Sequence, residues 1–317
     1  MQVEECVDAA AHVKEQAHDV DWNKVLVVGL GQIGFPVAKY VKEKGFEVYG
    51  YDINQKAMED AKVFGIKQSS NFGGFGVYIL CVPTHRTDDI FKPQIESLLS
   101  VVRKIGTEAN SGSLISIEST IPRGTSRKVF ELINQRLHVA HVPHRWYASE
   151  QEFHGVNQLR VAGGVRDCCL RLAAKFYNGF NAGVISDRTR PLTPLNPAKS
   201  AEKSSMGGRI LPSLGISLHA VPDIDVAEAT KVTENAHRFL QIAFAEELYL
   251  YCRANHIDFF ELRDALNSKW NVEVLEPREG IGGHCLPKDT QIFLQSSSSK
   301  ILNAAVKVDQ DYRNSRK

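Results

Sequence analysis

The sequence lacks any apolar run near the roughly 20 residues that a helix needs to cross a bilayer. It also lacks a charge imbalance: the formal net charge is +1, which gives no electrostatic reason to expect nucleic acid or a membrane as a partner. The first 22 residues are rich in acidic side chains and contain no apolar segment of the secretory type. We therefore expect a globular chain, with residues 1–22 forming an appended amphipathic helix.

Cysteine is scarce and follows no scaffold pattern. The six cysteines among 317 residues are too few and too scattered for a small disulfide-rich domain. The adjacent pair Cys168 and Cys169 is typical of reduced thiols on a helix, which favours a cytoplasmic location. At roughly 150 residues per domain, the length favours two domains.

Glycines gather first behind an apolar, β-type run at 24–28. Residues 29–34 read Gly-Leu-Gly-Gln-Ile-Gly, a helical pattern follows, and a second strand at 46–51 ends in Asp52. Strand, glycine turn, helix, strand and acid in this order form the dinucleotide-binding fingerprint.

Each residue of this fingerprint has its own predicted role. Gly29 makes the tight turn, Gly31 admits the pyrophosphate to the helix N-terminus, and Gly34 allows the helix to pack closely on the strand. The carboxylate of Asp52 is expected to bind the adenine ribose and to repel a 2′-phosphate, so NAD is the predicted cofactor. The alternative is a glycine-rich turn in an α/β protein that has lost its cofactor.

The alternation of strands and helices continues towards residue 180. Strands are predicted at 76–82, 113–117, 139–142 and 159–161, and helices at 93–105, 125–137 and 167–177. This pattern predicts a doubly wound, Rossmann-type parallel sheet over residues 23–222. Loops at the carboxyl ends of such strands form the ligand crevice, which puts Thr84, Thr120 and the segment after Val142 on the cofactor side.

Residues 186–222 change in character and are rich in Pro, Gly, Ser and Arg. They are predicted to form a long loop insertion, either a lid or a plain surface insertion.

Helical periodicity then takes over and predicts a smaller all-α domain at 223–317. Its core is a long helix at 225–253 with an apolar stripe that includes Val226, Ala229 and Phe244. Shorter helices are predicted at 258–266, 290–295 and 300–311, with a frayed tail after Asp311. The long helix is also the predicted contact of a homodimer.

Three histidines, His138, His141 and His144, follow one another at intervals of three residues. On a strand this spacing sends alternate side chains to opposite faces, so the three cannot converge on one ion. No metal site is predicted.

A second glycine cluster leads to Cys285. Residues 280–289 read Gly-Ile-Gly-Gly-His-Cys-Leu-Pro-Lys-Asp, and Pro287 fits the first position of a helix. A thiol at a helix N-terminus beside cations is expected to have a lowered pKa and to act as a nucleophile. Lys231 and Asn235, four residues apart, share one face of the long helix. The alternatives are an incidental buried cysteine and a solvated polar pair.

Five stretches together resemble the UDP-glucose/GDP-mannose dehydrogenase family over about residues 24–312. The stretches are 28–34, Cys-Val-Pro-Thr at 81–84, Glu-Ser-Thr-Ile-Pro-Arg-Gly-Thr at 118–125, Ala-Glu-Ala-Thr-Lys-Val-Thr-Glu-Asn at 227–235, and Gly-Gly-His-Cys-Leu-Pro-Lys-Asp at 282–289. The resemblance implies a four-electron oxidation of the C6 alcohol of a UDP- or GDP-linked hexose to the acid, with two NAD used in turn.

The resemblance also implies the roles of site residues. Cys285 would form a thiohemiacetal and then a thioester, Lys231 and Asn235 would stabilise the oxyanion, and Asp289 and Thr120 would activate water. The expected cofactor contacts are Gly29, Gly31, Gln32, Ile33, Gly34, Asp52, Val82, Pro83, Thr84, Ser119 and Thr120. The expected substrate contacts are His144, Arg145, Lys231, Asn235, Gly282, Gly283 and Lys288.

The sequence departs from the family pattern at three places. His144 stands where the family has glutamate, and Glu150 or Glu152 are candidates to compensate. The 186–222 insertion separates the matching blocks, and its Arg188, Arg190 and Arg209 are candidates to reach a diphosphate. The sequence also ends where a further nucleotide-binding domain is expected, as in a truncated chain or a natural two-domain variant.

Two other functions fit the same sequence. One is a two-electron dehydrogenase of a smaller alcohol or hydroxy acid, which would not need Cys285. The other is a regulatory NAD-binding protein without turnover, which His144 and the short C-terminus favour.

Overall fold

The computed structural model describes residues 20–86, 88–89, 92–145, 155–179, 205–206, 209–210 and 212–316. The predicted N-terminal helix, Glu150, Glu152, Arg188, Arg190 and most of the 186–222 segment lie outside these residues. By its internal contacts the chain forms two units, Met1–Thr84 with Ile95–Glu228 and His85–Gln94 with Ala229–Lys317. We call them the Rossmann unit and the helical unit.

The Rossmann unit contains an eight-stranded sheet in the order β10-β7-β6-β5-β4-β1-β2-β3. Neighbouring strands are parallel except β6 and β7. The predicted fold class is therefore confirmed. The strands are β1 (Lys24–Val28), β2 (Glu47–Tyr51), β3 (Lys67–Gln68), β4 (Val77–Leu80), β5 (Leu114–Ile117), β6 (His138–His141), β7 (Arg160–Gly164) and β10 (Leu218–Val221). β8 (Ser205–Met206) and β9 (Arg209–Ile210) form a separate antiparallel pair.

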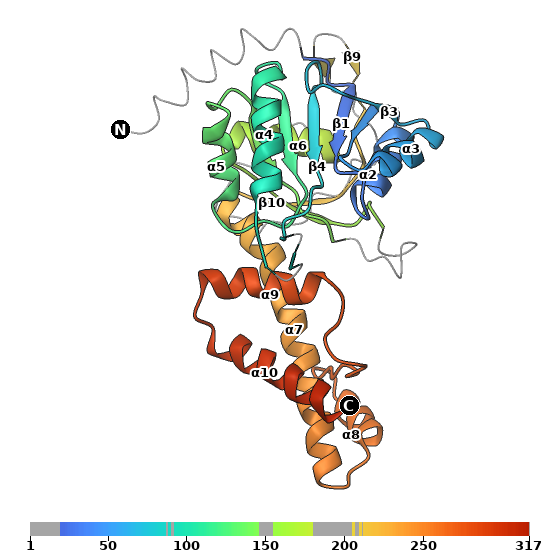
Figure 1. Cartoon of the computed structure of the whole chain (residues 1–317), viewed down its shortest axis with the longest axis vertical. Coiled ribbons are helices and arrows are strands. Elements are labelled where there is room, and N and C mark those ends of the chain that lie inside the picture. The colour runs from blue at the N-terminus through green and yellow to red at the C-terminus, as the bar shows by residue number, and fades with distance from the viewer. Residues whose placement is uncertain are drawn as a thin grey trace. The chain divides into compact units, whose positions relative to one another are not determined.

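Helices cover both faces of this sheet (Figure 1). α2 (Gly34–Glu43), α3 (Gln55–Val63) and α6 (Asp167–Asn178) share one apolar cluster with strand residues such as Val25 and Val27. α4 (Glu96–Glu108) and α5 (Thr125–Leu132) pack on the other face, against Leu26 and Val28. Successive β1 residues thus alternate between two cores, which is why the strand reads as an uninterrupted apolar run.

Several element boundaries differ from the prediction. The sequence pattern missed α3 and the short β3, and it missed β10, which lies inside the predicted 186–222 loop. α5 ends at Leu132 rather than at 137, because Asn134 and Gln135 have φ values of 52° and 57° that turn the chain out of the helix.

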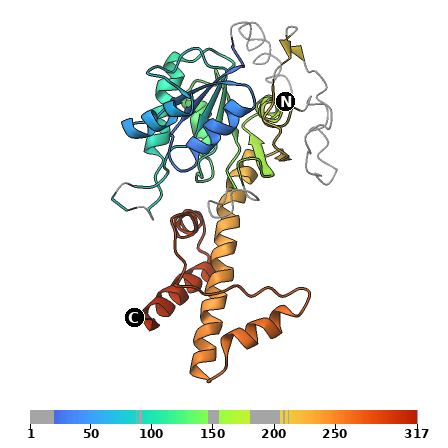
Figure 2. The ribbon, with the colours of Figure 1, turned by 90° about the vertical axis from the view of Figure 1, so that its right-hand side faces the viewer.

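The helical unit is built on α7 (Ile224–Ala254), which is unbroken over 31 residues (Figure 2) and whose first turn belongs to the Rossmann unit. α8 (Phe259–Asn267), α9 (Cys285–Ser296) and α10 (Lys300–Ser315) follow. A small core joins α7 to α10 through Phe239, Ala243, Ile281 and Ala305.

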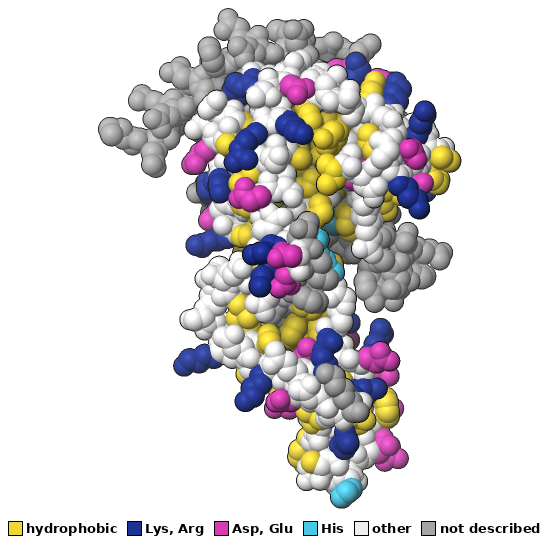
Figure 3. Space-filling model, viewed as in Figure 1, with side chains coloured by type: hydrophobic (Ala, Val, Ile, Leu, Met, Phe, Trp, Pro, Cys, Tyr) yellow, Lys and Arg dark blue, Asp and Glu magenta, His cyan; other side chains and the backbone are white. Residues whose placement is uncertain are grey.

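One prediction for this part of the chain is wrong. The tail after Asp311 is not frayed, since α10 continues to Ser315 and the buried Tyr312 donates a hydrogen bond to the Arg278 carbonyl oxygen. The apolar stripe of α7 is buried only in part, because Val226 and Phe244 are 48% and 55% exposed. The surface of the helical unit accordingly carries apolar side chains among its charges (Figure 3).

Within the described residues, no helix is both long enough and apolar enough to span a membrane.

Candidate active site

The glycine loop after β1 has the geometry that a dinucleotide requires. Gly29 has a φ of +87°, and a side chain there would lie 2.5 Å from the Cys81 carbonyl oxygen. A Cβ on Gly34 would lie 1.7 Å from the Gly29 carbonyl oxygen, so helix α2 needs glycine to pack this closely. Around Gly31, in contrast, no other atom lies within 4 Å of a Cβ, which leaves open room beside the loop for a pyrophosphate. These features fit NAD.

Asp52 follows the last residue of β2, and its side chain links the glycine loop to the end of this strand. Its carboxylate accepts hydrogen bonds from the amides of Leu30 (2.6 Å) and Asn54 (2.8 Å). The half-buried carboxylate therefore lies beside the loop, where the fingerprint places the acid that binds the ribose. Of the other predicted contacts in the loop, Gln32 is exposed and Ile33 packs partly against the core.

The loops after β4 and β5 meet beside the glycine loop at the point where the strand order reverses. The hydroxyl of Thr84 donates to the Thr120 carbonyl oxygen (2.7 Å), and that of Ser119 donates to the Val82 carbonyl oxygen (2.7 Å). The predicted cofactor residues of these two loops are thus joined to one another, with Thr84 and Ser119 buried and Pro83 exposed. In an open α/β sheet, this is where ligands bind.

A buried charge network under these loops was missed by sequence analysis. Glu118 has no exposed side-chain surface and pairs with Arg160 (2.9 Å), with His144 and with the hydroxyl of Tyr177. Burial alone would raise the pKa of Glu118, but Arg160 and His144 outweigh it and lower the pKa to about 2. The structure therefore places His144 against a carboxylate.

Arg145 follows His144 in the chain. Its guanidinium donates to the Leu159 carbonyl oxygen (3.2 Å), which links the segment after β6 to the residue before β7.

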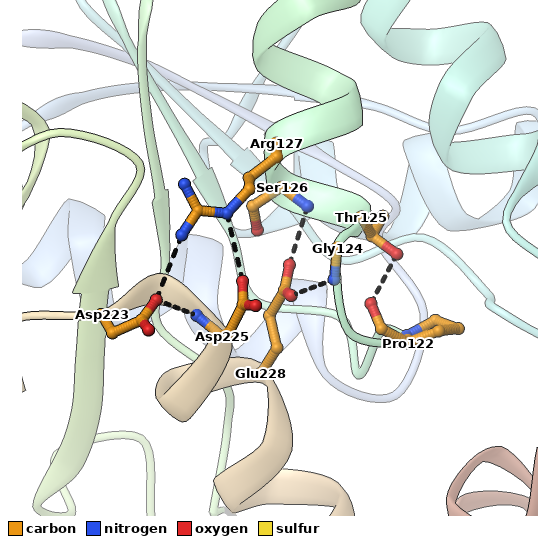
Figure 4. A network of polar contacts seen from close by, with 8 residues as sticks. All are labelled: Pro122, Gly124, Thr125, Ser126, Arg127, Asp223, Asp225 and Glu228. Atoms are coloured by element: carbon orange, nitrogen blue, oxygen red, sulfur yellow. Dashed lines mark hydrogen bonds and ion pairs between the residues drawn. The ribbon is translucent and has the colours of Figure 1, made fainter. Parts of the chain in front are cut away.

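The start of α7 is held on the Rossmann unit by Glu228. Its buried carboxylate accepts hydrogen bonds from the amides of Gly124 (2.6 Å) and Ser126 (2.7 Å), which cap the N-terminus of α5 (Figure 4). Arg127 adds ion pairs with Asp223 and Asp225 at the same place. Glu228 belongs to a stretch that the sequence analysis quoted, but it was not singled out.

In the helical unit, side chains of α10 form hydrogen bonds with the backbone of the glycine loop before α9. The Ile281 amide donates to Asp309 (2.7 Å), and Arg313 donates to the Ile281 carbonyl oxygen (2.6 Å). Gly280 and Gly283 have φ values of +98° and +76°, which explains glycine at both positions. The chain then enters α9, which begins at Cys285.

Pro287 is therefore the third residue of α9 and not the first, as predicted. The position still suits proline, because the first amides of a helix have no partner within the helix.

Polar side chains from α7 and α9 surround one carboxylate, that of Asp289. Asn235 donates to it, and Lys288 pairs with it at 3.1 Å. Lys288 and Asp289 are 5% and 1% exposed, so this ion pair is shielded from water. Lys231, one turn before Asn235 on α7, lies near enough to act on the charge of Cys285. The structure thus brings together Lys231, Asn235, Cys285, Lys288 and Asp289, five of the site residues that were predicted in this unit.

The predicted low pKa of Cys285 is wrong. Partial burial and then the Asp289 carboxylate raise the pKa of this thiol above its usual value, and Lys288 and Lys231 offset them only in part. The cations and the helix N-terminus are evident from the sequence, whereas the effect of the carboxylate one turn away depends on how the side chains pack around the thiol. Gly282 and Gly283, both exposed, leave open space beside the thiol loop.

His85 is a further residue of this unit that sequence analysis missed. Its ring packs edge-on against that of His284, with 4.4 Å between the ring centroids. Burial and then Lys288 lower the pKa of His85. Its only sequence signal was its place directly after Thr84.

The doubly wound sheet, the glycine loop and Asp52 define the Rossmann unit as an NAD-binding domain, and the cofactor prediction is confirmed. Residues 63–181 match the NAD-binding domain of the UDP-glucose/GDP-mannose dehydrogenase family, and residues 225–311 match the central domain of the same family. The chain therefore belongs to the UDP-glucose/GDP-mannose dehydrogenase family. Residues 3–89 also match the NAD-binding domain of D-isomer-specific 2-hydroxyacid dehydrogenases.

Curated relatives carry related names. The chain is 27% identical to a UDP-N-acetyl-D-mannosamine dehydrogenase of Methanococcus maripaludis, over 92% of this chain and 66% of the relative. It is 25% identical to an NDP-N-acetyl-D-galactosaminuronic acid dehydrogenase of Ralstonia nicotianae, over 93% of this chain and 70% of the relative. The chain thus spans about two thirds of the length of such relatives.

Solved structures share the fold. That of the UDP-N-acetylmannosamine dehydrogenase from Pyrococcus horikoshii superposes with a TM-score of 0.71 at 24% identity, covering 91% of this chain and 68% of that one. A 3-hydroxyisobutyrate dehydrogenase from Mycobacterium tuberculosis gives a TM-score of 0.64 at 15% identity, covering 92% of this chain and 94% of that one.

Proposed function

We propose that this chain carries the NAD-binding and thiol-bearing parts of a nucleotide-sugar dehydrogenase that oxidises a C6 alcohol to the acid. The observation that carries the proposal is the group around Cys285, in which Lys231, Asn235, Lys288 and Asp289 gather within one unit. A two-electron alcohol oxidation needs no thiol, whereas an aldehyde intermediate is retained and activated by one. The family membership and the names of the relatives support the same reaction.

NAD would accept a hydride in each of the two oxidation steps. Between them the Cys285 sulfur adds to the C6 carbonyl carbon, and the oxygen gains a proton to give a thiohemiacetal. Loss of the C6 hydride and of the hydroxyl proton then leaves a thioester. Lys231 and Asn235 are the donors on α7 suited to hold the carbonyl oxygen while it carries negative charge.

Hydrolysis would complete the reaction. Asp289, with Thr120 as the predicted second residue, is assigned to orient the water that attacks the thioester and to take its proton. The carbon–sulfur bond breaks, and the acid and the Cys285 thiol are released. The bonds from Asn235 and Lys288 keep Asp289 oriented, so the carboxylate needs little reorganisation.

The raised pKa of Cys285 fits a thiol that stays protonated until substrate arrives. The Asp289 carboxylate acts on the charge of Cys285 and is therefore the group suited to accept the thiol proton. The same raised pKa is the specific observation that favours the alternative, a two-electron dehydrogenase of a smaller alcohol, in which Cys285 would be a spectator.

For the substrate we propose a UDP-linked N-acetylhexosamine, as the names of the relatives suggest. Lys288, Gly282, Gly283, His144 and Arg145 are proposed substrate contacts. Gly282 and Gly283 are exposed and have open space beside them, which suits the approach of a sugar or phosphate group.

We also propose that the chain pairs with a second copy through α7. Phe244 and Tyr251 are 55% and 53% exposed along this helix, an apolar exposure that a partner helix would cover. Light scattering should then give the mass of a dimer, and Phe244→Asp should give that of a monomer; an unchanged mass would refute the contact.

The decisive experiment counts NADH formed per substrate consumed, with UDP-N-acetylmannosamine, UDP-glucose and GDP-mannose as the panel. Two NADH per acid support the proposal. Cys285→Ser should abolish acid formation, while Cys252→Ser, which changes a buried thiol on α7, should retain it. One NADH per substrate that Cys285→Ser does not change would establish the two-electron alternative. NAD binding without turnover of any sugar nucleotide would count against the proposed oxidation.

A further inference from the structure

A second group of thiols lies in the Rossmann unit, apart from the candidate active site. One ligand atom each from His138, Cys168 and Cys169 lie within 4.8 Å of one another. Among the described residues this is the group of His, Cys, Asp and Glu side chains gathered tightly enough to hold a metal ion. His138 is the first residue of β6, and the two cysteines lie in the first turn of α6.

The topology places this group at the end of the strands that lies opposite the cofactor crevice. β6 is parallel to β5, so His138 lies at the end where the strands that form the crevice begin. β7 runs antiparallel to β6, so the chain leaves β7 and enters α6 at the same end of the sheet. There the Val165 amide donates to the Val139 carbonyl oxygen (3.0 Å). The group therefore has no part in the proposed oxidation.

The set of donor atoms selects a class of ion. Two sulfurs and one imidazole suit a borderline-soft cation such as Zn²⁺, and oxygen-seeking Mg²⁺ and Ca²⁺ are disfavoured. With Zn–S near 2.3 Å and Zn–N near 2.0 Å, tetrahedral coordination needs ligand separations of roughly 3.5–3.8 Å. The observed limit of 4.8 Å means that the side chains must close by about an ångström at most.

The three residues differ in exposure, and the two that are partly exposed leave a path for an ion from solvent. Cys169 is 1% exposed, while Cys168 and His138 are half-buried. One side of the group is therefore packed and the other is reachable, which leaves a fourth position for water.

We propose that His138, Cys168 and Cys169 form a three-ligand site for a thiophilic divalent cation of the Zn²⁺ class, which fastens the first turn of α6 to β6. The site is structural or regulatory, since it lies away from the crevice. Its occupancy is expected to raise the thermal stability of the chain.

The test is a titration of the reduced, metal-free full chain with Co²⁺, which shows sulfur-to-metal charge-transfer absorption when thiolates bind it. We expect one equivalent, displaced by Zn²⁺, and at least about a tenfold loss of affinity in Cys168→Ser, Cys169→Ser and His138→Ala. Cys285→Ser and Cys6→Ser are the matched controls and should bind as the parent does.

A second measurement covers variants that fold poorly. Zn²⁺ should raise the Tm of the parent by several degrees, because a ligand that binds only the native state stabilises it. Cys168→Ser, at the half-exposed position, should show no such rise. Absence of a bound equivalent in the parent with Co²⁺ in excess, or charge-transfer absorption that survives in Cys168→Ser but is lost in Cys285→Ser, would overturn the site.

Discussion

A buried glutamate in the Rossmann unit and one in the helical unit have pKa values shifted in opposite directions. In the Rossmann unit, Glu118 is fully buried yet its pKa falls to about 2, because Arg160 and His144 face it. In the helical unit, Glu246 on α7 is also fully buried, but burial and the facing carboxylate of Asp309 raise its pKa to about 8. Two buried carboxyl groups are thus one charged and one neutral, because different side chains face them.

The thiols repeat this difference. Cys168 and Cys285 both lie in the first turn of a helix, where the helix dipole favours a thiolate. A hydrogen bond from Cys169, and then His138, lower the pKa of Cys168, whereas burial and Asp289 raise that of Cys285. The facing partners therefore decide the charge state, and the helix terminus alone does not.

Breaking the Glu118 network should have the largest effect. Glu118→Gln leaves Arg160, which is 1% exposed, without its counter-charge, and we expect a loss of about 3–5 kcal/mol in the free energy of unfolding. Urea denaturation at pH 7 measures it. Glu228→Gln is the matched control, a buried carboxylate bound to two amides and no cation, for which about 1–3 kcal/mol is expected.

The Glu118 effect should also depend on pH. Its native pKa lies below the usual 4.5, so its stabilisation is complete above that value and disappears as the pH falls towards about 2. The parent and Glu118→Gln should therefore converge in acid. Curves that stay parallel from pH 7 to pH 3 would show that the loss comes from packing and not from charge.

The two thiols should differ next in the pH dependence of their alkylation. Between pH 6 and pH 8 the rate at Cys285 should rise about 100-fold, because only the thiolate reacts and its pKa lies above this range. The rate at Cys168, already a thiolate, should stay nearly constant. Timed iodoacetamide labelling with peptide mass spectrometry measures the two alkylation rates separately. An equal pH dependence of the two rates would contradict the predicted difference in pKa between the thiols.

Stability should respond to Glu246 in the opposite sense to Glu118. Its native pKa of about 8 exceeds the usual 4.5, so the native state holds an extra proton between these values and the parent loses stability as the pH rises through them. Glu246→Gln should remove this slope and be more stable than the parent at pH 9, on the order of 1–3 kcal/mol.

Thermal unfolding at pH 6 and pH 9 measures this difference, with the exposed neighbour Glu247→Gln as control. Glu246→Gln that is less stable than the parent at both pH values would mean that the carboxyl group makes a contact that an amide cannot replace.

Local pattern was enough for the sheet and the glycine fingerprint. The apolar β1 run and the spacing of Gly29 and Gly34 are visible within a short stretch of sequence, and the structure confirms the fold class that they predicted. β10 could not be predicted, because its four residues pair with β7 from a stretch whose composition resembles a loop. Short strands depend on the partner more than on their own sequence.

The candidate active site shows the same limit. The residues Lys231, Asn235, Cys285 and Asp289 were found by spacing and by family resemblance, and the structure does gather them. The sign of the pKa shift of Cys285 was missed, because it depends on which side chain faces the sulfur. His138 and Cys168 likewise meet only through the packing of α6 on β6, which no local pattern encodes.

The smallest effect is expected from removing the charge of Asp289, which contributes to the raised pKa of Cys285. Asp289→Asn keeps the shape of the side chain and its place beside Asn235 but removes the charge that raises the pKa of Cys285. Alkylation of Cys285 at pH 7 should become several-fold faster, because a larger fraction of the thiol is then ionised. The effect stays small, since solvent screens charges at this partly exposed group. Lys231→Ala is the opposing control and should slow it, because it removes a cation that favours the thiolate. If both variants shift the rate in the same direction, local loosening and not charge governs this thiol, and the contrast between the two units would then hold for their carboxylates alone.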